Sequence, residues 1–324
     1  MPYSDRPYDE ATGDFKRLWD FLVQDYADRN GDYSWSVGRI ADWKYNLATP
    51  RKYSPLFLTK SAHLWLDDAG QVVAFAIDEN LDEELAVFAK QGHDELFGPV
   101  LDWAVEHWAS YAASDDPNDP CGQLTVYLDE GEQREAAILA ERGWQDLGRQ
   151  TTSRRYDVAA KAAEPIGLPE GFRVVSMAED PNFESKIRLY HDAWHHGSPV
   201  TQVDLELHEY CRTAPTYDLA LDISVVSPEG EHVAGCTAFP DYVNDYAEIE
   251  RVCTRSDYRR RGLAAAAIRA CFRAIHAKGL RTAYLTGMAE DAISLYGKLG
   301  ATGEWHTHGW QRAVRRVADR SPAG

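Results

Sequence analysis

Long apolar runs are missing from this chain of 324 residues. No stretch approaches the roughly 20 apolar residues that a membrane-spanning helix needs, so we expect no membrane segment and no membrane partner. The first residues are polar and acidic, and no apolar stretch follows them. We therefore expect no secretory signal and a cytoplasmic location.

Cysteine is scarce, and basic residues are fewer than acidic ones. The five cysteines include no Cys-x-x-Cys pair, so the sequence predicts neither a zinc site nor a redox centre. The histidines lack neighbouring carboxylates or cysteines at ligand spacing, and we expect no metal. The formal net charge of −18 would repel a phosphate backbone, which argues against nucleic acid as a partner.

The length and the order of elements predict two domains. A chain of this size exceeds the usual span of about 100 to 200 residues per domain. Small residues, two prolines and two glycines gather between Val158 and Phe172, and we interpret 159–167 as a linker. On either side of it strands alternate with helices in the same order, a pattern typical of an α/β fold. We expect two tandem mixed-sheet domains flanked by helices, at 1–158 and 168–324.

In the second half, a helix is predicted between two strands, at 246–254 and 281–286. Its apolar positions recur with helical spacing and form one stripe that would pack on the sheet. The residues of this stripe are Ile268, Cys271, Phe272 and Ile275.

A basic loop lies between the first of these strands and the helix. Three consecutive arginines precede a glycine in a protein that is otherwise strongly acidic. The glycine permits close backbone approach, and the free N–H groups of the helix start favour an anion such as pyrophosphate. The residues of this loop and helix start are Arg259, Arg260, Arg261, Gly262, Leu263, Ala264 and Ala265.

A strand, Arg-x-x-Gly-x-Ala and a helix in succession resemble the coenzyme A pyrophosphate loop of the GNAT superfamily of N-acyltransferases. The resemblance implies an α+β GNAT-like fold and binding of acetyl-CoA or another acyl-CoA by the residues of the basic loop. It also implies that the preceding strand diverges from its neighbour, and that the backbone of Val252, Cys253 and Thr254 bonds the pantetheine arm.

The same resemblance suggests catalytic residues. Glu248 lies eleven residues before Arg259, where many GNAT enzymes carry the glutamate that deprotonates the acceptor amine. Strand alternation places Glu250 on the same face. Alternatively, these glutamates face solvent or pair with an arginine.

A second motif lies near the end of the sheet. Tyr296 precedes Gly300 as in the family helix whose tyrosine protonates the leaving thiolate, although ordinary packing would also explain it. Two positions depart from the family pattern: Ala289 replaces an asparagine, and Ala301 replaces an aromatic residue. These departures bear on the pose of the cofactor and on the choice of donor.

The first half lacks these features. With Gly98 placed against Gly262, the arginines become Glu95, Leu96 and Phe97, and the tyrosine position is Leu139. A glutamate without arginines would disfavour a pyrophosphate. We expect residues 1–158 to be a degenerate, catalytically silent copy.

The leading hypothesis is an acyl-CoA-dependent N-acyltransferase that transfers acetyl from acetyl-CoA to a primary amine of a small molecule. Two alternatives stay open: a non-catalytic acyl-CoA-binding or regulatory module, and a transferase that uses a carrier-protein or aminoacyl-tRNA donor. The acceptor is not identified. We expect a monomer or a weak homodimer.

Overall fold

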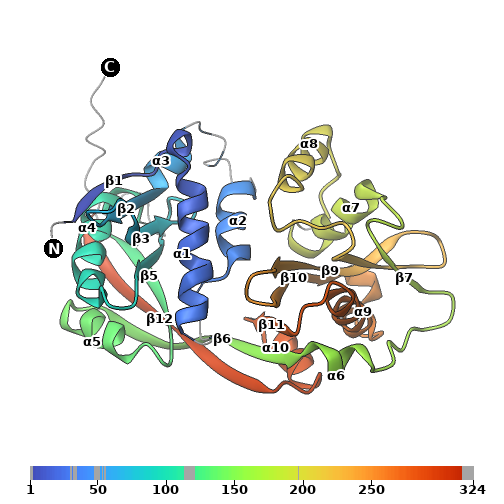
Figure 1. The fold of residues 1–324 in the computed structure, drawn as a ribbon. Helices are drawn as coiled ribbons and strands as arrows, with labels where there is room; N and C mark the ends of the chain where they lie inside the picture. Colours follow the sequence, from blue (N-terminus) through green and yellow to red (C-terminus); the bar gives the residue numbers. More distant parts are fainter. Residues whose placement is uncertain are drawn as a thin grey trace. The chain divides into compact units, whose positions relative to one another are not determined.

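The computed structural model shows a mixed α/β protein with sheets flanked by helices, which confirms the predicted fold class (Figure 1). None of the helices in the described part of the chain is both long enough and apolar enough to cross a membrane. The structure describes residues 3–29, 31, 35–46, 52, 54, 56–112, 121–195 and 197–315.

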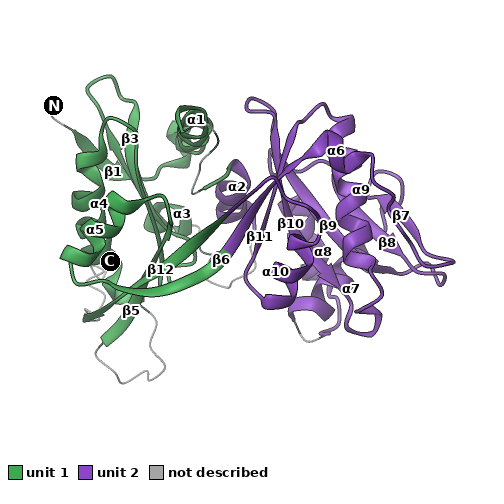
Figure 2. Ribbon diagram, turned by 90° about the horizontal axis from the view of Figure 1, so that it is seen from below, with its two compact units in different colours: residues 1–36, 47–151, 305–324 green, residues 37–46, 152–304 purple. Residues whose placement is uncertain are grey.

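The chain forms two compact units that do not follow its linear order (Figure 2). Unit 1 holds residues 1–36, 47–151 and 305–324, and unit 2 holds residues 37–46 and 152–304. The division of the sequence into two copies, at 1–158 and 168–324 with a linker at 159–167, stays a prediction. The units are described separately below.

The sheet of unit 1 has the order β1-β2-β3-β4-β5-β12. Its neighbours pair antiparallel except β4 and β5, which are parallel. Its last strand is also the last strand of the chain. The strands are β1 (Ser4–Pro7), β2 (Ala62–Leu66), β3 (Val72–Asp78), β4 (Glu84–Ala89), β5 (Cys121–Asp129) and β12 (Gly303–Arg315). The helices are η1 (Glu10–Thr12), α1 (Asp14–Asp28), α3 (Phe57–Ser61), η3 (Asp94–Leu96), α4 (Phe97–Trp108), η4 (Ala109–Tyr111) and α5 (Gln133–Glu141).

The sheet of unit 2 has the order β7-β8-β9-β10-β11-β6, and only β10 and β11 run parallel. The strands are β6 (Gln145–Asp157), β7 (Arg173–Ser176), β8 (Asp222–Val226), β9 (His232–Asp241), β10 (Tyr246–Thr254) and β11 (Thr282–Gly287). The helices are α2 (Val37–Tyr45), α6 (Val158–Ala162), α7 (Phe183–Trp194), α8 (Gln202–Cys211), η5 (Ser256–Tyr258), α9 (Leu263–Ala277) and α10 (Glu290–Gly297).

The predicted helix of the second half is α9, and its apolar stripe is confirmed. Ile268, Cys271, Phe272 and Ile275 are fully buried in the core that α9 forms with the sheet. Successive side chains of β10 alternate between the two faces of the sheet. Because Ala247 and Ile249 belong to the α9 core, Glu248 and Glu250 face the other side, on which α2 and α7 pack.

Candidate active site

The basic loop and the start of α9 form an open cluster of N–H groups. Gly262 is the N-cap residue of α9 and has φ +79°, a left-handed conformation that costs glycine little. The first hydrogen bond of the helix runs from the amide of Ala266 to the carbonyl of Gly262. The amides of Leu263, Ala264 and Ala265 therefore have no partner within the helix and point toward its N-terminal end, where the dipole favours an anion.

The three arginines of the loop are exposed, and in the described part of the chain no carboxylate lies within ion-pair distance of them. Arg259 Nε donates to the carbonyl of Thr254 at 3.3 Å, and an Nη of Arg261 donates to the carbonyl of Asp257 at 3.1 Å. Arg260 has φ +63°, which turns the loop before the helix. Within the described residues, none of the three forms an ion pair, so their charge is available to an anionic ligand.

Strand β10 separates from β11 just before this loop. Their parallel pairing covers Tyr246 to Glu248, whereas β10 stays paired with β9 as far as Thr254. A bulge lies between Glu250 and Cys253, and Arg251 in it has φ +54°. In this described stretch, the β11 side of the strand beyond Glu248 has no ladder partner, so backbone groups there are open to another molecule.

Val252, Cys253 and Thr254 lie in this diverging part of β10. Cys253 is buried, and burial raises the pKa of its thiol to about 12, so the thiol stays protonated and unreactive at neutral pH. The prediction for Cys253 therefore concerns its backbone, which lies in the diverging part of β10.

The two glutamates of β10 influence each other electrostatically. Glu248 is 9% exposed. Burial raises the pKa of Glu250 well above its usual value, and the neighbouring Glu248 carboxylate raises it further, although Arg39 opposes the shift. A carboxylate whose pKa lies closer to neutrality is a better general base for an ammonium group.

Tyr296, on α10, is also buried, with 5% exposed. Burial raises the pKa of its hydroxyl above the usual value, and the Glu250 carboxylate raises it further. The phenol therefore stays protonated and can donate. Its backbone carbonyl accepts a hydrogen bond of 2.8 Å from Tyr156, which fixes α10 to β6.

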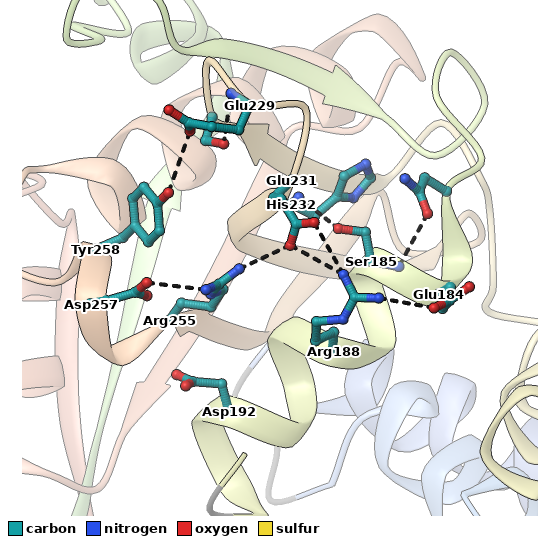
Figure 3. Close-up of polar contacts among 12 residues, drawn as sticks. Glu184, Ser185, Arg188, Asp192, Glu229, Glu231, His232, Arg255, Asp257 and Tyr258 are labelled. Atoms are coloured by element: carbon teal, nitrogen blue, oxygen red, sulfur yellow. Dashed lines mark hydrogen bonds and ion pairs between the residues drawn. The ribbon is translucent and has the colours of Figure 1, made fainter. Parts of the chain in front are cut away.

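The start of the basic loop is held by side chains that the sequence analysis did not single out (Figure 3). Asp192, on α7, accepts hydrogen bonds from the amide of Ser256 at 2.5 Å and from its hydroxyl at 3.0 Å. Arg255 pairs with Glu231 and Asp257, each at 3.0 Å. Because Ser256 begins η5, these contacts set where the loop leaves β10.

Helix α2, from the first part of the chain, packs beside the glutamates in unit 2. A Cβ at Gly38 would lie 2.8 Å from Phe239 and 3.2 Å from Oε2 of Glu248, so a larger residue would not fit without a shift. Asp42, one turn further along, forms a 2.6 Å ion pair with Arg251 in the bulge. Residues 37–46 therefore support the bulge, and no local signal in the sequence indicates this.

The corresponding region of unit 1 differs. Gly98 lies inside α4 rather than before it and does not have the left-handed backbone of Gly262. A Cβ at Gly98 would meet the Arg142 guanidinium at 2.6 Å. Leu139, at the position of the tyrosine, is fully buried. In the described residues of both units, no group of three or more histidine, cysteine or acidic side chains is placed to bind a metal.

Comparison with known proteins finds a family model that matches part of the chain. Residues 181–301, which lie within unit 2, match the family model of the acetyltransferase (GNAT) family. No curated protein matches the chain.

Solved structures with this fold cover nearly the whole chain. A GCN5-related N-acetyltransferase from Sphaerobacter thermophilus has a TM-score of 0.62 at 17% identity, covering 97% of each chain. A tandem GNAT protein from the clavulanic acid biosynthesis pathway has a TM-score of 0.61 at 13% identity, covering 96% of this chain and 98% of the other. At these identities the likeness concerns the fold.

Proposed function

We propose that this protein is an acyl-CoA-dependent N-acyltransferase, because residues 181–301 match the acetyltransferase (GNAT) family model and a tandem GNAT protein shares the fold over nearly the whole chain. It transfers acetyl to a primary amine of a small molecule. The observation that carries the proposal is the divergence of β10 from β11 directly before the basic loop. This arrangement brings open backbone groups, free arginines and two carboxylates together in one unit.

The donor is acetyl-CoA or another acyl-CoA, which supplies an activated thioester. The N–H groups at the start of α9 and the arginines suit its phosphates, since both favour anions. The open backbone of β10 suits an arm that carries amide groups. The residues that would hold the donor are Val252, Cys253, Thr254, Arg259, Arg260, Arg261, Gly262, Leu263, Ala264 and Ala265.

The chemistry needs one base and one acid. Glu248 takes a proton from the acceptor amine, and Glu250 lies on the same face of β10, where burial and the Glu248 carboxylate raise its pKa. Tyr296, whose buried hydroxyl is protonated at neutral pH, donates a proton to the departing sulfur. The bond to the amine nitrogen forms and the bond to sulfur breaks.

The proposal places the protein in the cytoplasm, where its five free cysteines would stay reduced. Unit 1, with Glu95 in place of an arginine, is proposed to bind no donor. We therefore expect one donor site per chain.

Calorimetric titration of acetyl-CoA and of free CoA into the full chain tests the donor site. We expect one site, which Arg259→Glu abolishes. Arg315→Glu, the same charge change on an exposed strand residue of the other unit, should leave binding intact. If neither ligand binds, the acyl-CoA proposal is wrong and a carrier-bound donor becomes the next candidate.

Thiol release from acetyl-CoA in the presence of a panel of primary amines tests turnover. Glu248→Gln should lower the rate with an accepted amine by about 100-fold or more, the usual contribution of a general base. Binding of acetyl-CoA without turnover of any amine would favour the non-catalytic module.

A further inference from the structure

A cavity of about 430 Å³ lies in unit 2 between the segment that follows α8 and the end of β9. Its volume is in the range of small-molecule sites. Side chains that line it include Arg212, Thr216, Tyr217, Asp218, Pro240 and Tyr242. None of these residues was singled out in the sequence.

Arg212 brings an uncompensated positive charge to this cavity. Its guanidinium lies 3.7 Å from the centroid of the Phe183 ring, which fixes its plane. Its Nε is buried and has no hydrogen-bond acceptor, and in the described part of the chain no carboxylate forms an ion pair with it. In a protein with a net charge of −18, a guanidinium in a cavity without an acidic partner is unusual.

Two further polar groups beside Arg212 lack partners among the residues that the structure describes. Thr216 is 1% exposed, and its Oγ1 has no hydrogen-bond partner. His208, one helical turn before Arg212, is 9% exposed, and its Nε2 also lacks a partner. Burial lowers the pKa of His208 to about 4, so this imidazole is neutral at pH 7. Buried polar groups without partners are costly and point to a ligand that would satisfy them.

The other polar groups of the cavity are already engaged. Asp218 forms a 2.5 Å ion pair with Lys278 and accepts a 2.8 Å hydrogen bond from the amide of Ala220. Burial opposes its ionisation, but these bonds hold the pKa of Asp218 below its usual value. Tyr217 donates to Asp222 at 2.7 Å. The charge left for a ligand is therefore that of Arg212.

We propose that this cavity binds a carboxylate group of the acceptor, so that the substrate is a small amine that also carries a carboxylate. This inference rests on the proposed function. A guanidinium binds a carboxylate through two parallel hydrogen bonds, and Thr216 offers a further donor. The single positive charge and the nearby Asp218 favour a monoanion over a dianion such as phosphate.

The cavity and the proposed base border the same pair of strands. Pro240, in the cavity wall, lies on β9, and its neighbour Phe239 pairs with Glu248 on β10. The proposal therefore requires an acceptor whose amine and carboxylate are separated by several bonds, so that the amine reaches Glu248 while the carboxylate lies at Arg212.

The test uses the full chain with saturating acetyl-CoA. It compares three acceptors that carry the amine on the same four-carbon chain and differ in the terminal group, namely 5-aminopentanoate, 5-aminopentanamide and 4-aminobutyl phosphate. Hydrogen bonds to a charged group predict that kcat/KM for the carboxylate exceeds that for the amide by about 10-fold to 100-fold. Arg212→Met should reduce this ratio to near one, and Thr216→Val should reduce it by a smaller factor. Arg173→Met, which removes an exposed arginine elsewhere in unit 2, should leave the ratio unchanged.

Equal kcat/KM for carboxylate and amide, an unchanged ratio in Arg212→Met, or a preference for the phosphate would each overturn the inference and leave the proposed function standing. If acetyl-CoA does not bind, the proposed function fails instead. The cavity is then tested by calorimetric titration of 5-aminopentanoate alone. Binding that Arg212→Met abolishes supports a carboxylate site, and the absence of binding overturns it.

Discussion

Replacing Asp192 by alanine should weaken donor binding without touching a residue that contacts the donor. The carboxylate accepts hydrogen bonds from the amide and the hydroxyl of Ser256 at 2.5 and 3.0 Å, at the point where β10 passes into the basic loop. Without these two hydrogen bonds the start of the basic loop is no longer held in place. Donor binding must then order the loop, which weakens the binding.

The size of the effect follows from these two bonds. A hydrogen bond to a charged group contributes about 1.5 to 3 kcal/mol, and an N-terminal helix cap about 0.5 to 2 kcal/mol. Since Ser256 is exposed and Asp192 half-buried, water recovers part of this, and we expect about 1 to 2 kcal/mol. This corresponds to an increase of roughly 5-fold to 30-fold in the Kd of CoA.

Two measurements separate the effect of Asp192 on the loop from its effect on donor binding. Calorimetry with CoA gives the change in Kd, and hydrogen exchange at the Ser256 amide reports whether the loop opens without any ligand. Asp192→Asn keeps one neutral acceptor and should raise Kd only about 2-fold to 5-fold. The control is Glu184→Ala, which removes another carboxylate of α7, one that pairs with Arg188 at 2.9 Å. This change should alter neither the Kd of CoA nor the exchange rate at Ser256.

Either of two results would contradict this role of Asp192. If exchange at Ser256 is as slow in Asp192→Ala as in the parent, the carboxylate does not hold the loop in solution. If exchange accelerates while the Kd for CoA stays within a factor of about 2, the loop is held but its order does not govern donor binding.

Three further predictions concern unit 2. Lys186→Met leaves Asp222 buried without its 2.8 Å partner and should lower the free energy of unfolding by about 3 to 5 kcal/mol, measured by denaturant titration; a loss below about 1 kcal/mol would contradict it. Gly262→Ala places a side chain at φ +79° and should lower the free energy of unfolding by about 1 to 2 kcal/mol. The cause is backbone strain alone, since a Cβ there meets no atom within 4 Å. Thermal unfolding should show the loss of stability, and the Kd of CoA should rise. The rate should rise with pH as the glutamate pair ionises. Glu250→Gln should move this rise to lower pH, because it removes a like charge from beside Glu248. A rise that stays at the same pH would exclude the glutamate pair as its origin.

The sequence by itself determined the local parts of the site. The stripe on α9, the strand that precedes it, and the run of arginines before Gly262 lie within about one helix and one strand of chain, where periodicity and capping act. The resemblance to the GNAT superfamily rests on this same segment, and the matched family model covers it. The mixed α/β fold followed from the alternation of strands and helices.

Only the tertiary structure decided what surrounds this segment. Gly38 is close to Glu248, Asp42 pairs with Arg251, and Asp192 holds Ser256, although long stretches of chain separate the members of each pair. Such contacts depend on how α2 and α7 pack on the sheet, and a charged or small residue on a helix looks the same in sequence whether or not it has a distant partner. The charge of Arg212 was hidden for the same reason: among the residues that the structure describes, no carboxylate forms an ion pair with it, and only the packed structure shows that.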